Sequence, residues 1–173
     1  VTLGGDTTLS GVGVVFHSAV DGAKTLTVND SGTTQFLDKV GYTTALTSVT
    51  TDAAGTTDLN GASVTTTGAQ TYNDAVVLSA NTTLTGSGIT FGSTIKSTGG
   101  SNYSLGITDS GVTTLGGAIG SATLADKVSS LTLSSTGGIS LNAGSVYSTS
   151  SQSYTGAVTL GSNTTCLLYT SPS

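Results

Sequence analysis

An internal repeat constrains the fold of this chain more than any other feature. Residues 1–20 align without a gap to residues 76–95, at an offset of 75. Nine positions are identical: Val1/Val76, Leu3/Leu78, Thr7/Thr82, Thr8/Thr83, Leu9/Leu84, Gly11/Gly86, Gly13/Gly88, Phe16/Phe91 and Ser18/Ser93. A third copy starts at residues 158–165, which resemble residues 76–83. Self-similarity at a fixed period is the signature of a repeat architecture.

The repeat divides residues 1–165 into units of about 1–75 and 76–157, with the start of a third at 158–165. The offset between units grows to 79 and then to 82. The additional residues lie at Ser97–Gly100 and near Ser121–Thr123, which are rich in Ser, Thr and Gly. Such stretches are typical of loops, and stacked repeats tolerate insertions there.

Short alternating runs fill each unit. Leu26–Val28 and Ile89–Phe91 both place a Thr between two apolar residues, and turn residues such as Asn29–Gly32 separate the runs. This alternation predicts short strands with one apolar face and one Thr-bearing face. No stretch keeps a helical period over three turns, and Ala118–Val128 is the only weak helix candidate. The chain is therefore predicted to be all-β.

Two all-β architectures fit a unit of about 80 residues. The first is a β-solenoid whose units are several stacked turns of about 20 residues each. The alternative is a pair of tandem β-sandwich domains. Aromatic residues make up only 5% of the chain, and the strands are short. Both features favour the solenoid, with about eight turns forming a rod of roughly 40 Å.

Stacked turns would place like residues above one another. Thr side chains are expected to form columns that exchange hydroxyl hydrogen bonds between turns, and Asn residues at repeated corners are expected to form amide ladders. The ladder candidates are Asn60/Asn142 and Asn81/Asn163. Thr-x-Thr pairs, by contrast, do not recur between units, because Thr25/Thr27 aligns with Ser104/Gly106. This comparison argues against a regular hydroxyl lattice of the kind that binds ice.

The last eight residues, 166–173, depart from the repeat. The repeat predicts Leu at position 166, and the chain has Cys166 there. The octapeptide matches the translation of a transposase adapter used in sequencing libraries, and it contains the only Cys and the only Pro. We interpret residues 166–173 as not native and exclude them from the fold prediction.

Composition excludes several functional classes. The net charge is −5 with only four basic residues, all Lys, whereas nucleic-acid binding needs clustered Lys and Arg. No apolar run approaches the roughly 20 residues that a membrane helix needs. With a single histidine, His17, and no Cys outside the last eight residues, a transition-metal site lacks ligands. No metal, other cofactor, nucleic-acid partner or membrane insertion is therefore expected, and His17 is expected at the surface.

The aspartates give little support for an enzyme. Polysaccharide lyases and glycosidases with a β-helix fold use carboxylates, so a pair such as Asp52 with Asp58 is the enzymatic alternative. Most aspartates lose their charge in the next unit, however, and only Asp30/Asp109 recurs. That pair lies in Asp-Ser-Gly, where Asp supports a tight turn. The chain is predicted not to be an enzyme.

Residues 64–86 resemble the repeats of large bacterial surface exoproteins, namely filamentous-haemagglutinin-like and autotransporter-type adhesins. Residues 56–61 and 107–115 add to the likeness, which covers essentially all of residues 1–165. The resemblance implies a right-handed parallel β-helix that is exported from a Gram-negative cell and serves adhesion at the outer cell surface. No catalytic residues come with it.

These observations predict a non-enzymatic, extracellular shaft within a larger adhesin. Its expected partners are flanking repeats of the same parent chain and, beyond them, host or environmental glycans or proteins. The alternative is that this segment binds glycans itself, through aromatic side chains on an exposed Tyr/Thr face. The candidate contact residues are Tyr42, Tyr72, Tyr147 and Tyr154, of which Tyr72 and Tyr154 recur and are equally compatible with half-buried packing positions.

Overall fold

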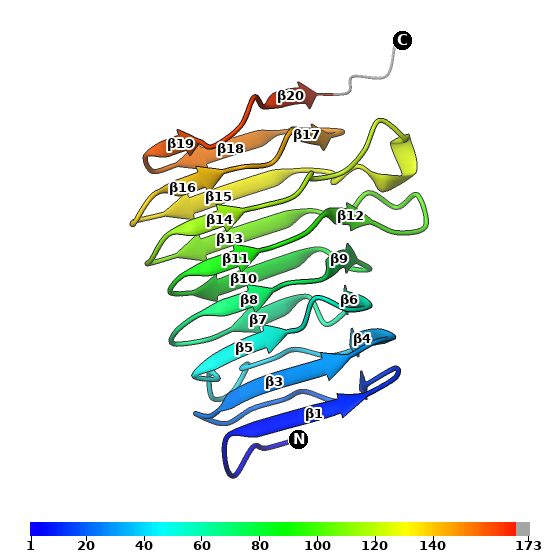
Figure 1. Cartoon of the computed structure of the whole chain (residues 1–173), viewed down its shortest axis with the longest axis vertical. Helices are drawn as coiled ribbons and strands as arrows, with labels where there is room; N and C mark the ends of the chain where they lie inside the picture. Colours follow the sequence, from blue (N-terminus) through cyan, green and yellow to red (C-terminus); the bar gives the residue numbers. More distant parts are fainter. Residues whose placement is uncertain (169–173) are drawn as a thin grey trace.

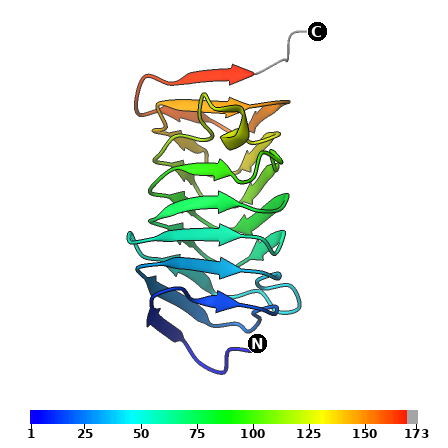
Figure 2. The same cartoon turned by 90° about the vertical axis from the view of Figure 1, so that its right-hand side faces the viewer.

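A computed structural model describes residues 1–168 and shows a β-solenoid of eight stacked turns (Figure 1). Every pair of neighbouring strands is parallel, as turns of one coil require. Together Figures 1 and 2 show a right-handed coil, the usual hand for parallel crossovers. The solenoid prediction is confirmed, and the tandem sandwich is excluded.

The strands form three long sheets. The eight-stranded sheet contains one strand from every turn: β1 (Thr7–Gly11), β3 (Thr25–Asp30), β5 (Ser48–Thr51), β8 (Gln70–Tyr72), β11 (Ile89–Phe91), β14 (Thr113–Leu115), β16 (Ile139–Leu141) and β19 (Val158–Leu160). The second sheet contains β7 (Ser63–Thr65), β10 (Thr82–Gly86), β13 (Leu105–Asp109), β15 (Leu131–Ser135) and β18 (Gln152–Thr155). The third contains β2 (Val15–Phe16), β4 (Thr33–Phe36), β6 (Thr56–Leu59), β9 (Ala75–Leu78) and β12 (Ile95–Ser97). A two-stranded sheet pairs β17 (Ser145–Ser148) with β20 (Thr165–Leu168), and bridges through Ile119 connect β17 to β12.

The interior is thin and mainly aliphatic, as the alternating runs predicted. In β3, for example, Leu26 and Val28 are completely buried, while the alternate residues Thr25 and Thr27 face outward. Aromatic residues stack across neighbouring turns inside the coil: Phe16 lies 4.9 Å from Phe36 between ring centroids. Burial inside and backbone hydrogen bonding between turns together hold the rod.

The turns differ in length, and the longer ones contain the insertions. Successive outward residues in the middle of the eight-stranded sheet are 19 to 26 residues apart. The two longest intervals contain the Ser97–Gly100 and Ser121–Thr123 insertions. Both are loops as predicted, except that Ser97 is the last residue of β12. The weak helix candidate contains only a 3₁₀ turn, η1 (Leu124–Asp126). Within residues 1–168 no helix has the length and apolar character to cross a membrane.

The repeat units do not coincide with whole turns. By sequence β10 repeats β1 and β13 repeats β3, yet β1 and β3 lie in the eight-stranded sheet and β10 and β13 in the second sheet. Likewise β14, which repeats β4, has moved from the third sheet to the eight-stranded one. Each unit therefore spans about three and two-thirds turns. As a result, a strand of the second unit lies one sheet away from the strand of the first unit that it repeats.

The predicted asparagine ladders are wrong for this reason. Asn60 and Asn142 are one unit apart, so they lie several turns from each other, in corners that follow strands of different sheets (β6 and β16), and Asn81 and Asn163 are separated in the same way. Asn81 instead accepts a hydrogen bond at its Oδ1 from the backbone N–H of Ser104, at 2.9 Å. The corresponding residue in the first unit, Asp6, accepts from the N–H of Thr25, also at 2.9 Å. The repeated corner residue caps the next turn.

Close stacking of the turns makes some glycines irreplaceable. Gly55 has φ +76°, and a Cβ there would meet the carbonyl oxygens of Gly32 and Asp30 in the turn below. Gly99 has a similar φ, +66°, but a Cβ there meets nothing within 4 Å. Both Ala substitutions incur about 1–2 kcal/mol of left-handed strain. We expect Gly55→Ala to lower the free energy of unfolding by at least a further ~1 kcal/mol in urea titrations, because backbone atoms cannot move aside. Equal effects of the two variants would contradict this steric argument.

Candidate functional site

Of the four candidate tyrosines, Tyr72 is buried and cannot touch a ligand. Its side chain is 0% exposed, and its ring lies 5.1 Å from that of Phe91 between centroids. Its hydroxyl donates to Oε1 of Gln70 at 3.0 Å, and the side-chain amide of Gln70 donates to three acceptors around it. The prediction of Tyr72 as a contact residue is therefore wrong, because the alternating strand places it on the inner face.

Tyr154 occupies the equivalent position in the second unit and makes the same contact. Its hydroxyl donates to Oε1 of Gln152 at 3.2 Å, and its ring packs partly buried against the core. Burial raises the pKa of the Tyr154 hydroxyl, and the neighbouring Cys166 adds to the shift. Tyr154 is an inward-facing residue like Tyr72, not part of an outer binding face.

Tyr42 and Tyr147 face outward but lie far apart along the rod. Tyr42 is 67% exposed in the turn before β5, with the Lys39 ammonium 3.8 Å from its ring centroid. Tyr147 is half-buried on β17, with Lys127 Nζ 5.8 Å from its ring centroid. Each is a single aromatic beside a lysine, and the four tyrosines form no common surface.

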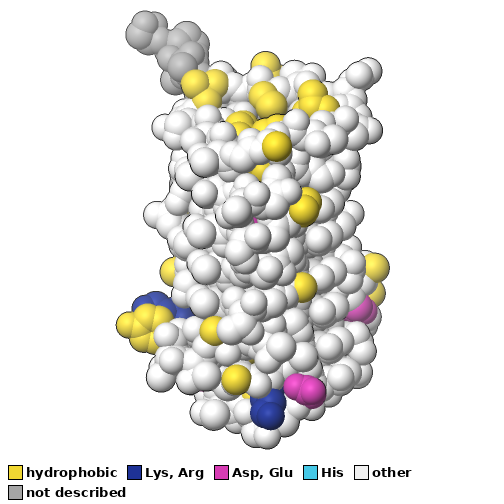
Figure 3. Space-filling view, turned by 90° about the vertical axis from the view of Figure 1, so that its left-hand side faces the viewer, with side chains coloured by type: hydrophobic (Ala, Val, Ile, Leu, Met, Phe, Trp, Pro, Cys, Tyr) yellow, Lys and Arg dark blue, Asp and Glu magenta, His cyan; other side chains and the backbone are white. Residues whose placement is uncertain are grey.

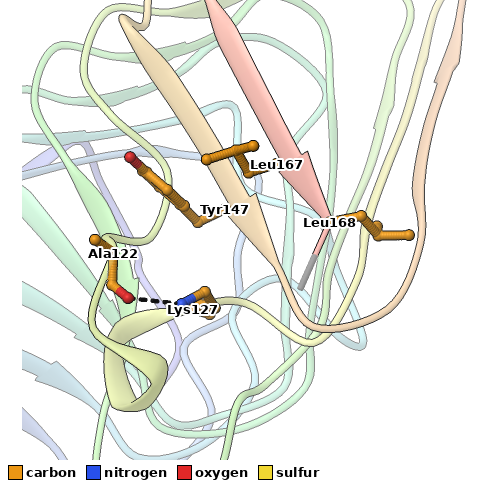
Figure 4. Close-up of a pocket in the computed structure, with 5 residues that line it drawn as sticks. All are labelled: Ala122, Lys127, Tyr147, Leu167 and Leu168. Carbon is orange, nitrogen blue, oxygen red and sulfur yellow. Dashed lines mark hydrogen bonds between the residues drawn. The ribbon is translucent and has the colours of Figure 1, made fainter. Parts of the chain in front are cut away.

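Tyr147 also lines a hollow of about 240 Å³ near the C-terminal end of the rod (Figure 4). Ala122, Lys127, Leu167 and Leu168 complete its lining, and Lys127 Nζ donates to the Ala122 carbonyl at 2.8 Å. The two leucines belong to the 166–173 segment that the sequence predicts is not native. Of that segment, residues 166–168 continue β20, where Cys166 lies beside Val146, and residues 169–173 lie outside the described part.

Asp30 and Asp109 form two copies of one buried corner network. Asp109 accepts four hydrogen bonds: at 2.7 and 2.8 Å from the N–H groups of Gly88 and Ile89 one turn below, at 2.7 Å from Gly111 N–H, and at 2.9 Å from the Thr113 hydroxyl. Asp30 accepts the matching four from Gly13, Val14, Gly32 and Thr34. Each carboxylate is 1% exposed. The recurring Asp-Ser-Gly therefore supports its own turn, as predicted, and also ties it to the turn below.

The pKa values of the corner aspartates and of Asp74 are shifted in opposite directions. Burial disfavours the charged form of Asp109, but the hydrogen bonds from Gly88, Ile89, Gly111 and Thr113 outweigh it and lower its pKa. The same balance lowers the pKa of Asp30. Asp74 is 3% exposed, and burial raises its pKa because the hydroxyls of Thr51 and Thr57 compensate only in part.

These shifts predict a two-sided pH dependence of stability. A lowered folded pKa stabilises the fold above the unfolded value of about 3.9, and this contribution disappears as the pH falls through the folded pKa. A raised pKa does the reverse, so the contribution of Asp74 is complete below about pH 4 and is lost as the pH rises through its folded pKa. We expect the urea midpoint of the unmodified chain to fall steeply below about pH 4. The fall should be smaller in Asp109→Asn, and Asp74→Asn should flatten the dependence of the midpoint on pH above pH 4. Parallel profiles for all three proteins would contradict the assignment.

The other residues that the sequence singled out for catalysis or metal binding make separate contacts. Asp52 Oδ1 accepts the backbone N–H of Asp30 at 2.9 Å, while Asp58 Oδ2 accepts from the Gln35 side chain at 3.3 Å. Asp58 Oδ1 is buried without a hydrogen-bond partner. His17 is exposed, as expected. In residues 1–168 no three His, Cys or Asp side chains come together as a possible metal site.

The outer surface carries Thr and Ser columns whose regularity the comparison of the repeat units missed. Along the middle of the eight-stranded sheet, one outward residue from each turn pairs in register with the next: Thr8, Thr27, Thr50, Thr71, Thr90, Thr114, Ser140 and Thr159. The second sheet carries two such columns. The first contains Ser63, Thr83, Gly106, Thr132 and Ser153, and the second contains Thr65, Thr85, Thr108, Ser134 and Thr155. The expected Thr columns are thus confirmed. The expected hydroxyl hydrogen bonds between turns are wrong for these three columns, because among residues 1–168 none of their hydroxyls bonds to the next one. The expectation of irregular hydroxyl pairs is wrong, because the neighbours that matter are turns about 20 residues apart, not units.

The third sheet differs in its outward side chains. The Thr33 and Thr56 hydroxyls lie 3.1 Å apart and hydrogen-bond to each other, and Gln35 pairs with Asp58. Lys96 is exposed on the same sheet. On the side of the rod shown in Figure 3, charged side chains are few and lie mostly toward the N-terminal end. Two faces of the rod therefore carry hydroxyl columns, and the third carries mixed side chains that pair with one another.

Comparison with known proteins adds no further assignment. No protein-family model matches the chain, and neither curated proteins nor solved structures give a match.

Proposed function

We propose that this chain is a non-enzymatic shaft segment of a large bacterial surface adhesin. In this role it extends the parent protein and positions adhesive regions that lie elsewhere. The supporting observation is continuous stacking: each turn hydrogen-bonds to the next on up to three sides, and a mainly aliphatic interior runs from Phe16 to Val146. A rod built this way keeps an extended shape because backbone hydrogen bonds join each turn to the next on several sides. Location at the outer cell surface and association with flanking repeats follow from the resemblance to adhesin repeats.

The shaft role predicts a particular mechanical response. When the chain is pulled from its two ends in single-molecule force spectroscopy, we expect turns to detach one at a time. Each turn of 19 to 26 residues should release ~3.5 Å of contour per residue. The forces should exceed those that unfold a helical reference domain of similar size. Loss of the whole structure in one low-force step would contradict the proposal.

Two companion assays separate the alternatives. On a glycan array, a signal that Tyr42→Ala and Tyr147→Ala both remove would favour a glycan-binding module over a shaft. Turnover of a polysaccharide that Asp52→Asn or Asp58→Asn abolishes would favour a lyase or glycosidase. The shaft proposal expects neither signal.

A further inference from the structure

The two columns on the second sheet form a hydroxyl array, defined by the pairs Ser63/Thr65, Thr83/Thr85, Gly106/Thr108, Thr132/Ser134 and Ser153/Thr155. Seven of the ten residues are exposed, and the other three are half-buried. None carries a charge or a bulky side chain. Toward the N-terminal end Lys39 aligns with Ser63, and the array stops there.

The hydroxyls of the array have no partners inside the protein. Inward Thr residues such as Thr57 and Thr113 donate to buried carboxylates. Among residues 1–168, however, the nine side-chain hydroxyls of the array make no hydrogen bond to protein. A hydroxyl can donate one hydrogen bond and accept two, so the array offers both functions at every position except Gly106. Such a surface matches a partner that both donates and accepts hydrogen bonds at regular intervals.

The fold fixes the array as a lattice. Neighbouring turns lie about 4.8 Å apart, and alternate residues along a strand about 6.7 Å apart. Each strand of the array is hydrogen-bonded to its neighbours, and the β-branched Thr side chains have few rotamers, so little freedom is lost on binding. These two repeats are comparable with the spacings between oxygen atoms in hexagonal ice. Because ice is uncharged and each of its water molecules both donates and accepts, it complements this array in charge and in hydrogen bonding.

We propose that the hydroxyl array of the second sheet binds ice. Neutral glycans are a poorer match, because the array contains no aromatic side chain on which a sugar ring could stack. Acidic glycans would require Lys or Arg, which are likewise absent from it. The Thr methyl groups between the hydroxyls exclude loosely held water, and the hydroxyls join the outer layer of the crystal.

Uptake into growing ice tests the proposal. The full chain, labelled on lysine, is added to water that freezes slowly onto a cold probe, and the labelled fraction in the ice is measured. We expect the chain to enter the ice. Thr108→Tyr, at the centre of the array, should lose most of this uptake because a large ring prevents flat contact. Thr94→Tyr, at an exposed position just before β12, and Thr90→Tyr, in the eight-stranded sheet, should retain it.

Several outcomes would overturn the proposal. One is exclusion of the unmodified chain from ice to the same extent as serum albumin. Another is equal uptake of Thr108→Tyr, or loss of uptake in Thr90→Tyr instead. Retention on an insoluble neutral polysaccharide without uptake into ice would assign the array to a glycan. Circular dichroism and urea midpoints of all variants confirm that only the surface has changed.

Discussion

Replacing Asp109 by Asn is expected to lower the free energy of unfolding by about 3 kcal/mol or more. The carboxylate accepts three backbone N–H groups and one hydroxyl while 1% exposed. Asn keeps the shape but has one acceptor oxygen, and its amide would point an N–H at another N–H. Hydrogen bonds to a charged acceptor contribute roughly 1.5–3 kcal/mol each, so losing two outweighs any local relaxation.

Hydrogen exchange gives the most direct measurement. In Asp109→Asn the amides of Gly88 and Ile89 should exchange much faster, because their acceptor in the turn above is lost. Asp30→Asn should do the same at Gly13 and Val14. The control is Asp38→Asn, since Asp38 is exposed, and its expected change is within about 0.5 kcal/mol. Unchanged exchange at Gly88 and Ile89 would show that the corner carboxylate does not hold the two turns together.

The second large effect is expected at Tyr72. Tyr72→Ala removes a ring that is 0% exposed and stacked on Phe91, and we expect a loss of about 3–5 kcal/mol. Tyr72→Phe keeps the ring but leaves Oε1 of Gln70 without its donor in a buried position, so about 1–3 kcal/mol is expected. Urea titrations of both variants separate packing from hydrogen bonding.

The matched control is Tyr42→Ala. Tyr42 is 67% exposed, and its contact with Lys39 is a cation–π pair of about 0.5–1 kcal/mol. Its replacement should therefore change the urea midpoint only slightly. If Tyr72→Ala were as mild as Tyr42→Ala, the interior around Phe91 and Gln70 would not be the packed core described above.

The sequence was sufficient to predict the architecture because alternation and turn residues act locally. Leu26-Thr-Val28 specifies an inner and an outer face without knowledge of its neighbours. The sequence was insufficient to predict the contacts between turns, because these contacts depend on which strands lie next to each other. Tyr72 recurs at Tyr154, but recurrence does not reveal on which side of the strand a residue lies. The regularity of the hydroxyl columns was hidden because members such as Thr71 and Thr90 align only when the chain is compared with itself at the turn length.

The third-of-a-turn mismatch between unit and coil explains why the outer surface is so monotonous. Strands that repeat each other, such as β1 and β10, are assigned to different sides and so acquire different neighbours. A bulky or charged side chain that fits beside the neighbours of one strand would clash with, or be repelled by, the different neighbours of the strand that repeats it. Thr, Ser and Gly fit beside both sets of neighbours. A side chain that recurred at the same position of every unit would lie one face further around the rod in each successive unit of a longer array. It would return to the same face of the rod after three units, which correspond to eleven turns.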